Sequence, residues 1–245
     1  MKAQYGIDAP NVVLYFVVAG AGCLAVSFVP GVPPPIPTLF PWVSASWLLT
    51  ALILILASTV FKLRLRDRIL DSLHLKGDER VLDMGCGRGL MLIGLAKRLP
   101  NGEAVGVDLW RKSDQSGNSS EATLRNAKAE GVESRVSLET ADIRHLPFDH
   151  QLFDVVISSW AIHNIRDLEG REVAILEALR VLKPGGRLIL VDIWTIDEYA
   201  KLLQGIRMED VKVSRPSFIF LVPTKIVEAI KPIRPFVDKN LTLSS

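Results

Sequence analysis

A long stretch without charge limits what this chain can fold into more than any other feature. Between Ala9 and Phe61 there is no Asp, Glu, Lys or Arg, although the 245-residue chain carries 29 basic and 27 acidic side chains. The rest of the sequence has the composition of an ordinary globular domain. The chain therefore divides into an apolar amino-terminal quarter and one domain of usual size.

The apolar quarter contains two runs of helix-forming length, expected as helices at about residues 11–29 and 42–61. Each run approaches the ~20 apolar residues that a helix needs to cross a hydrocarbon core of about 30 Å. The proline-rich stretch Pro30–Pro41 between them cannot continue a helix, because each proline removes a donor and clashes with the preceding turn. The sequence therefore predicts a two-helix membrane hairpin over residues 1–61.

Two other interpretations of the apolar quarter stay open. A secretory signal would explain the first run, which follows Lys2, but it leaves the second run without a role. A hydrophobic hairpin packed on the domain or on another subunit would use the close helix contact that Gly20 and Gly22 permit. In a membrane, Trp42 and Trp47 are expected at the interfacial end of the second helix. The two helices are also a surface through which homo-oligomers could form.

Basic residues directly after the second run give the predicted hairpin an orientation. They are Lys62, Arg64, Arg66 and Arg68, whereas the loop between the two runs carries no charge. The positive-inside rule then places the N-terminus and the domain in the cytoplasm. Residues 62–77 are expected to form a basic helix or linker, which either lies near the headgroups or covers the domain as an ordinary amphipathic helix.

Strand-like and helix-like segments alternate through residues 78–245. Apolar runs bounded by turn residues predict strands at 80–84, 104–108, 136–139, 153–158 and 187–192. Helical periodicity predicts helices at 90–99, 119–130 and 168–182. Two closing strands, one of them antiparallel, are expected at 211–213 and 218–222. This alternation predicts an α/β fold with a doubly wound, mostly parallel sheet of seven strands, covered by helices on both faces.

The first predicted strand ends in a glycine-rich loop, Asp83-Met-Gly-Cys-Gly-Arg-Gly89. Ligands of such sheets bind beyond the carboxyl ends of the strands, and glycines let the backbone approach them closely. One residue separates Gly87 from Gly89, whereas the dinucleotide fingerprint has two. Asp83 suits a ligand with positive charge, such as a sulfonium and an α-amino group, rather than a pyrophosphate. Asp108 ends the second strand, where a carboxylate accepts hydrogen bonds from both ribose hydroxyls.

This loop and four later segments resemble, in order, the motifs of class I S-adenosylmethionine-dependent methyltransferases. The segments are Val81–Gly89, Val105–Asp108, Ala141–Phe148, Phe153–His163 and Leu182–Asp192. The resemblance looks closest to small-molecule methyltransferases of the ubiquinone and menaquinone biosynthesis type, and it does not extend to the apolar quarter. It implies a Rossmann-like methyltransferase domain over residues 78–245 that uses S-adenosylmethionine and releases S-adenosylhomocysteine.

The resemblance also assigns residues to the cofactor. Those implied to bind it are Asp83, Gly85, Cys86, Gly87, Gly89, Asp108, Leu109, Ala141, Asp142, Ile143 and Ser158. Asp83 would orient the amino group, Asp108 would hold the ribose, and Asp142 would accept from the adenine amino group. Cys86 is expected as a small residue that fits the loop, since nothing in the sequence places a base beside it.

Four residues are expected to line the pocket of the methyl acceptor: Asn118, Ser159, Trp160 and His163. His163 follows the fourth strand on the active-site side and is the candidate base, needed only if the acceptor must lose a proton. A hydrogen-bonded loop histidine is the alternative, and Tyr199 is a weaker candidate. The predicted membrane hairpin motivates the hypothesis that the acceptor is small and lipophilic.

Composition excludes several other classes of protein. A net charge of +2 argues against a nucleic-acid partner, and the two cysteines, Cys23 and Cys86, do not indicate a disulfide framework. The four histidines have no cysteine partners at metal-ligand spacing, so no metal is expected. A membrane-anchored methyltransferase is the preferred function. A non-catalytic S-adenosylmethionine-binding module and a nicotinamide-dependent oxidoreductase on a similar fold are the alternatives.

Overall fold

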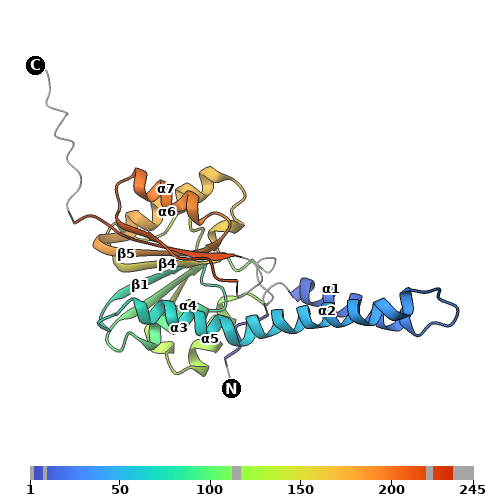
Figure 1. The fold of residues 1–245 in the computed structure, drawn as a ribbon. Coiled ribbons are helices and arrows are strands. Elements are labelled where there is room, and N and C mark those ends of the chain that lie inside the picture. The colour runs from blue at the N-terminus through green and yellow to red at the C-terminus, as the bar shows by residue number, and fades with distance from the viewer. Residues whose placement is uncertain (1–2, 8–9, 112–116, 219–222, 234–245) are drawn as a thin grey trace, which may run out of the picture.

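The computed structural model describes residues 3–7, 10–111, 117–218 and 223–233. Their centre is a seven-stranded sheet with the strand order β3-β2-β1-β4-β5-β7-β6 (Figure 1). The strands are β1 (Arg80–Met84), β2 (Glu103–Asp108), β3 (Val136–Thr140), β4 (Phe153–Ser159), β5 (Leu182–Ile193), β6 (Glu209–Val213) and β7 (Thr224–Ile230). Neighbouring strands among β1 to β5 pair in parallel, whereas β7 is antiparallel to both β5 and β6. The predicted mostly parallel sheet of seven strands is thereby confirmed.

Helices cover both faces of the sheet (Figure 1). On one face lie α3 (Lys62–Ser72), α4 (Leu90–Lys97) and α5 (Ser120–Ala129), and on the other lie α6 (Leu168–Val181) and α7 (Ile196–Gly205). Successive side chains of a strand point to opposite faces, so Val81 belongs to the core under α3 and α4 while Leu82 belongs to the core under α6 and α7. Because both faces are buried, the strands read as continuous apolar runs rather than alternating ones.

Three predicted elements start more than two residues away from where the structure has them. Strand β5 begins at Leu182 rather than at 187, because the Lys-Pro-Gly-Gly segment already belongs to the strand. The strand expected at 218–222 lies mostly outside the described residues, and β7 begins later, at Thr224. The second apolar helix begins at Ile36 rather than at about 42, because Pro37 lies in its first turn, where no intrahelical donor is lost, and Pro41 is accommodated inside it.

The apolar quarter forms a hairpin of two antiparallel helices, α1 (Pro10–Ser27) and α2 (Ile36–Leu56). Gly20 is buried at their contact, where a Cβ atom would meet Leu48 Cγ at 2.9 Å, whereas a Cβ atom at Gly22 would meet nothing. The Trp47 ring packs against those of Tyr15 and Phe16, with centroids 5.7 and 6.0 Å away. Gly20 therefore serves close helix packing as expected, while Gly22 does not, and Trp47 lies between the helices.

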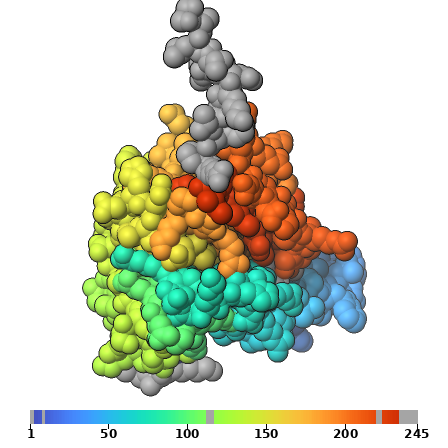
Figure 2. Space-filling model, turned by 90° about the vertical axis from the view of Figure 1, so that its left-hand side faces the viewer, coloured from blue at the N-terminus to red at the C-terminus, as the bar shows by residue number. Residues whose placement is uncertain are grey.

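The hairpin projects away from the domain (Figure 1). Its apolar side chains are exposed along its length. Figure 2 shows the end of the domain that lies opposite the hairpin, and blue atoms of the hairpin are visible behind the domain. Phe28 and Trp42 are 78% and 77% exposed. Judged by length and composition alone, two helices are long and apolar enough to cross a membrane: Pro10–Ser27 and the continuous helix Ile36–Ser72.

Helix α2 runs without interruption into the domain. A single π-helical turn, η1 (Ala57–Phe61), joins it to α3. The apolar side chains of α3, Leu65, Ile69 and Leu70, are buried in the same core as α4. Within residues 62–77, Lys62–Ser72 therefore form an amphipathic helix that covers the domain.

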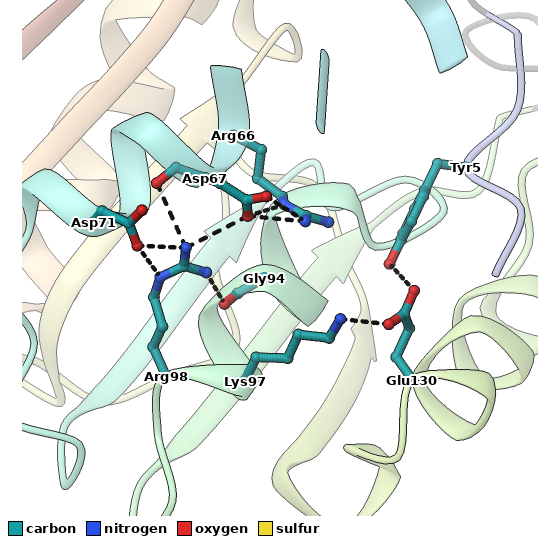
Figure 3. Close-up of polar contacts among 8 residues, drawn as sticks. All are labelled: Tyr5, Arg66, Asp67, Asp71, Gly94, Lys97, Arg98 and Glu130. Atoms are coloured by element: carbon teal, nitrogen blue, oxygen red, sulfur yellow. Dashed lines mark hydrogen bonds and ion pairs between the residues drawn. The ribbon is translucent and has the colours of Figure 1, made fainter. Parts of the chain in front are cut away.

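Polar contacts attach α3 and the amino-terminal segment to the domain (Figure 3). Arg98 of α4 donates to Asp71 at 2.6 Å and to Asp67 at 3.4 Å. Lys97 forms an ion pair with Glu130, which also accepts a 3.5 Å hydrogen bond from the Tyr5 hydroxyl. These contacts join the residues before α1 and the helix after α2 to the same face of the domain.

Backbone atoms of the amino-terminal segment are held as well. The buried Lys62 ammonium donates to the carbonyl oxygens of Tyr5 and Gly6, at 3.2 and 2.7 Å. The Asn126 side chain accepts from the Gln4 backbone N–H at 2.8 Å and donates to its carbonyl at 3.0 Å. Both ends of the hairpin are thus fixed to the domain.

The buried position of α3 predicts the effect of shortening one of its side chains. Leu70 is 1% exposed, and Leu70→Ala should lower the free energy of unfolding by about 2–5 kcal/mol, because a cavity replaces the lost methyl groups. Urea unfolding of the full chain in detergent measures this. Leu124→Ala, at a 45% exposed position, is the control and should change it by less than about 0.5 kcal/mol. Equal effects of the two substitutions would contradict the packing of α3.

Candidate active site

A cavity of about 910 Å³ lies at the carboxyl ends of β1, β2 and β4. It occupies the switch point of the sheet, where β1 pairs with β2 on one side and β4 on the other. Thirteen of the residues predicted for the site line it: Asp83, Gly85, Cys86, Gly87, Asp108, Leu109, Asn118, Ala141, Asp142, Ile143, Ser159, Trp160 and His163. The predicted residues therefore gather around one cavity, where they form 13 of the 29 lining residues.

The loop after β1 depends on glycine at two points. Gly85 has a φ of +75°, and a Cβ atom there would approach Ala161 Cβ to 2.2 Å. Gly87 has a φ of +50°, and its backbone N–H donates to Asp108 Oδ2 at 2.8 Å. A positive φ is costly for residues with a Cβ atom. The glycines therefore bring the loop close to the cavity and join it to the end of β2.

Asp83 is a buried carboxylate without a full set of partners. It is 1% exposed, and its Oδ2 atom has no hydrogen-bond partner among the described residues. Burial raises the pKa of Asp83 to about 7, and the nearby charge of Asp108 contributes to the increase. An unpartnered carboxylate in a cavity wall is costly until a cation or donor pairs with it. Asp83 is therefore placed to receive a positively charged group.

Asp108 is held in place by three donors. Its Oδ1 atom accepts from the backbone N–H of Trp110 at 2.6 Å and from the Asn118 amide at 3.1 Å, in addition to the Gly87 contact on Oδ2. Asn118 is 3% exposed, and its own Oδ1 atom has no partner within the described part of the chain. Asn118, predicted for the acceptor pocket, thus lies beside the carboxylate predicted to hold ribose. Residues 112–116 of the same loop lie outside the described residues.

Asp142 is paired with a residue that the sequence did not single out. The Arg144 guanidinium donates to both of its oxygens, at 3.1 and 2.6 Å, and holds the pKa of Asp142 below its usual range. Leu109, 40% exposed, and Ile143 line the cavity with it. This part of the wall combines apolar surface with one ion-paired carboxylate.

Three of the residues predicted to bind the cofactor are explained by their bonding, packing or burial within the protein. The hydroxyl of Ser158 donates to the Met84 carbonyl at 2.9 Å, and the residue does not line the cavity. Gly89 also lies outside the lining, and a Cβ atom there would meet Ile93 and Thr123 at 2.9 Å. Burial raises the pKa of the Cys86 thiol well above its ordinary value, so the residue has no thiolate character to act as a nucleophile.

On the other side of the cavity His163 is paired with Asp192. His163 lies in the 3₁₀ turn η3 (Ile162–Asn164) after β4, and Asp192 is 2% exposed near the end of β5. The His163 Nδ1 atom lies 2.5 Å from Asp192 Oδ1, and its backbone N–H donates to Oδ2 at 3.1 Å. The buried Tyr199 hydroxyl donates to the same Oδ2 atom at 3.4 Å, and burial raises the pKa of that phenol.

Sequence reasoning missed Asp192, Arg144 and the hairpin residues, among other residues of the site. Asp192 stands at the carboxyl end of a strand, as Asp83 and Asp108 do, and this shared position was the available signal. Four residues from the amino-terminal quarter also line the cavity: Ile7, Val12, Leu54 and Ser58. No local pattern marks them, because only the folded chain brings the hairpin to the strand ends.

Comparison with known proteins identifies the domain. A family described as a methyltransferase domain matches residues 75–216, more than half of the chain. The chain belongs to this family, and S-adenosylmethionine is the cofactor that membership assigns to the cavity. Membership also removes the nicotinamide-dependent oxidoreductase from consideration.

Individual relatives agree with this assignment. Methyltransferase GfsG of Streptomyces halstedii is 34% identical over 140 residues, which are 56% of this chain and 47% of that protein. The ubiquinone/menaquinone biosynthesis C-methyltransferase UbiE of Dinoroseobacter shibae is 33% identical over 127 residues, 52% of this chain and 47% of that protein. The chain thus spans about half the length of the curated relatives it matches.

Solved structures show the same fold. A SAM-dependent methyltransferase from Aquifex aeolicus is 18% identical and aligns with a TM-score of 0.56, over 74% of this chain and 97% of that one. This likeness supports the Rossmann-like architecture of the sheet and its helices.

The residues present fit S-adenosylmethionine. At Asp83 the cavity has a buried carboxylate with one unpartnered oxygen, which would hold the amino group. Acceptor oxygens at Asp108 and Asn118 would hold the ribose hydroxyls. The wall beyond them supplies Leu109 and Ile143 for the adenine ring. When bound, the cofactor supplies an electrophilic methyl group on a sulfonium centre.

The raised pKa of Asp83 predicts how cofactor affinity depends on pH. A cation favours the ionised carboxylate, so below pH 7 the free protein must lose a proton before it binds. S-adenosylmethionine affinity should fall by up to about tenfold per pH unit below 7. Equilibrium dialysis with labelled cofactor at pH 5.5 to 7 measures this.

Asp83→Asn tests whether this carboxylate is responsible. The variant should bind more weakly at pH 7 and lose the dependence on pH below that value. Asp149→Asn, at an exposed position, should behave as the wild type. Parallel pH profiles for the wild type and Asp83→Asn would show that another group controls binding.

Proposed function

We propose that this protein is a membrane-anchored methyltransferase that transfers the methyl group of S-adenosylmethionine to a small lipophilic acceptor. The observation that carries the proposal is the shared cavity. Asp83 and Asp108 line one part of it, His163 lines another, and Val12 and Leu54 of the apolar hairpin line a third. Cofactor groups, a base and apolar surface therefore meet in one space.

His163 and Asp192 can remove a proton from the acceptor. A carboxylate only accepts hydrogen bonds, so the 2.5 Å contact places the hydrogen of His163 on Nδ1. In the neutral ring the Nε2 atom then carries the lone pair and can serve as a general base. Asp192 orients the ring and stabilises the imidazolium that forms, while Tyr199 and the backbone N–H of His163 hold Asp192.

A base of this kind suits an acceptor with an acidic hydroxyl group. Removal of the proton from a phenol or enol raises the electron density on the oxygen and on the conjugated ring carbons. The same residue therefore supports transfer to oxygen or to carbon. UbiE, by its name, is a C-methyltransferase of quinone biosynthesis, and an aromatic or enolic lipid is the acceptor class that we infer.

Substitution of the base separates catalysis from binding. His163→Ala should lower the rate of methyl transfer by about 10²–10⁴-fold, since general-base catalysis contributes that much, and leave the dissociation constant of S-adenosylmethionine within about twofold. Asp192→Asn should lower the rate in the same direction. The measurement is transfer of labelled methyl into a lipid extract.

His150→Ala is the matched control, because His150 is exposed in a loop and does not line the cavity. Full activity of His163→Ala would refute the base, while cofactor binding without transfer to any acceptor by the wild type would favour a non-catalytic module.

The hairpin is the proposed membrane anchor. Its exposed apolar side chains, its two helices of spanning length and the basic residues of α3 support this assignment. The turn between α1 and α2 would lie outside the cytoplasm, whereas the domain would lie inside it. Self-association through the outer faces of the helices is a further expectation of this arrangement.

Cysteine labelling tests the topology. Val29→Cys places a thiol in the turn between α1 and α2, and Asp149→Cys places one in an exposed loop of the domain. In a Cys23→Ser background, a membrane-impermeant maleimide should label Val29→Cys on intact cells and Asp149→Cys only after permeabilisation. Equal labelling of both thiols, or complete release of the protein by carbonate, would refute the two-pass anchor.

A further inference from the structure

The cavity continues beyond the methyltransferase domain to the base of the hairpin. Ile7 precedes α1, Val12 lies in the first turn of α1, Leu54 lies in the last turn of α2, and Ser58 lies one turn later, in η1. At about 910 Å³ the cavity is near the upper end of the ~300–1,000 Å³ usual for ligand pockets. Its volume is about three times the lower end of that range.

The two ends of this space differ in chemistry. The domain end carries the carboxylates of Asp83, Asp108 and Asp142, whereas the hairpin end presents the apolar side chains of Ile7, Val12 and Leu54. An occupant that satisfies both ends has a polar, reactive head and an apolar chain. Its head would lie near His163, and its chain would extend toward the hairpin.

Contacts within the protein fix the geometry of the cavity at its hairpin end. The Lys62 ammonium holds the carbonyl oxygens of Tyr5 and Gly6, which fixes the segment before α1 against the end of α2. The π-helical turn Ala57–Phe61 lies at the same level, and such turns are frequent at functional sites. The lining residues of both helices are therefore held in register with the domain.

We propose that Ile7, Val12, Leu54 and Ser58 form a binding site for the apolar chain of the acceptor, which enters the active site sideways from the bilayer. The proposal rests on the proposed function and deepens it. It assigns the acceptor to the amphiphiles that stay in the membrane while their head group reacts. The hairpin then serves as part of the substrate site as well as an anchor.

Two pairs of substitutions test the site. Val12→Trp and Leu54→Trp enlarge side chains that line it, and Leu14→Trp and Leu52→Trp enlarge neighbours on the same helices that are more than half exposed and outside the lining. Full-length protein in vesicles is supplied with labelled S-adenosylmethionine and the total lipid extract of the cells that make it. Methyl transfer to lipid and the dissociation constant of the cofactor are measured together.

Val12→Trp and Leu54→Trp should lower lipid methylation at least tenfold with cofactor affinity within twofold of the wild type, and the two control variants should keep both properties. If all four variants methylate lipid alike, the chain site is refuted and the proposed function stands. If the wild type methylates only water-soluble acceptors, the lipophilic acceptor is refuted and the chain site falls with it. If a Trp variant loses cofactor binding, Val12→Phe or Leu54→Phe replaces it in the test. The Phe variant should again lower lipid methylation while cofactor affinity stays within twofold of the wild type.

Discussion

The parallel pairing of β1 between β2 and β4 is the constraint on which the rest of the structure depends. It aligns Asp83 with Gly106 on one neighbour and with Ile157 on the other, so three strands end at the same level. The side chains that follow these strands then surround one space, whatever their distance in the sequence. Ligand binding at this edge is a consequence of strand order, because the chain runs from β1 to β2 on one side and from β4 to β5 on the opposite side.

The acidic residues of the site differ in how far the domain itself provides their partners. Asp142 is paired with Arg144 and Asp108 is held by three donors, whereas Asp83 is buried with one oxygen unpartnered. A buried carboxylate of this kind destabilises the empty protein and favours a cationic ligand. On the opposite wall Asp192 is satisfied by His163, by Tyr199 and by backbone donors. Asp83 is therefore available to a cationic ligand, whereas Asp192 holds the imidazole of His163.

Local signals in the sequence predicted most of the domain. The glycine loop after β1 and the serine cap of α5, where Ser119 accepts from the Ala122 N–H at 3.2 Å, depend on residues close in sequence. The start of α2 was predicted too late, because prolines were treated as uniformly helix-breaking although the first turn tolerates them. Asp192 and the hairpin part of the cavity were missed, since their roles arise from contacts between distant segments. Ser158 was assigned to the cofactor by position, but its side chain points to the Met84 carbonyl.

The unbroken helix from Ile36 to Ser72 has a consequence for selectivity. At 1.5 Å per residue its 37 residues extend about 55 Å, with one end among the apolar residues of the hairpin and the other packed in the core of the domain. A helix fixed at both ends leaves the domain little freedom to rise, sink or turn relative to a bilayer that contains the hairpin. The reactive centre would then stand at one height above the lipid chains. Among several hydroxyl groups on one lipid head, the enzyme would then methylate the one that lies at the depth of the reactive centre.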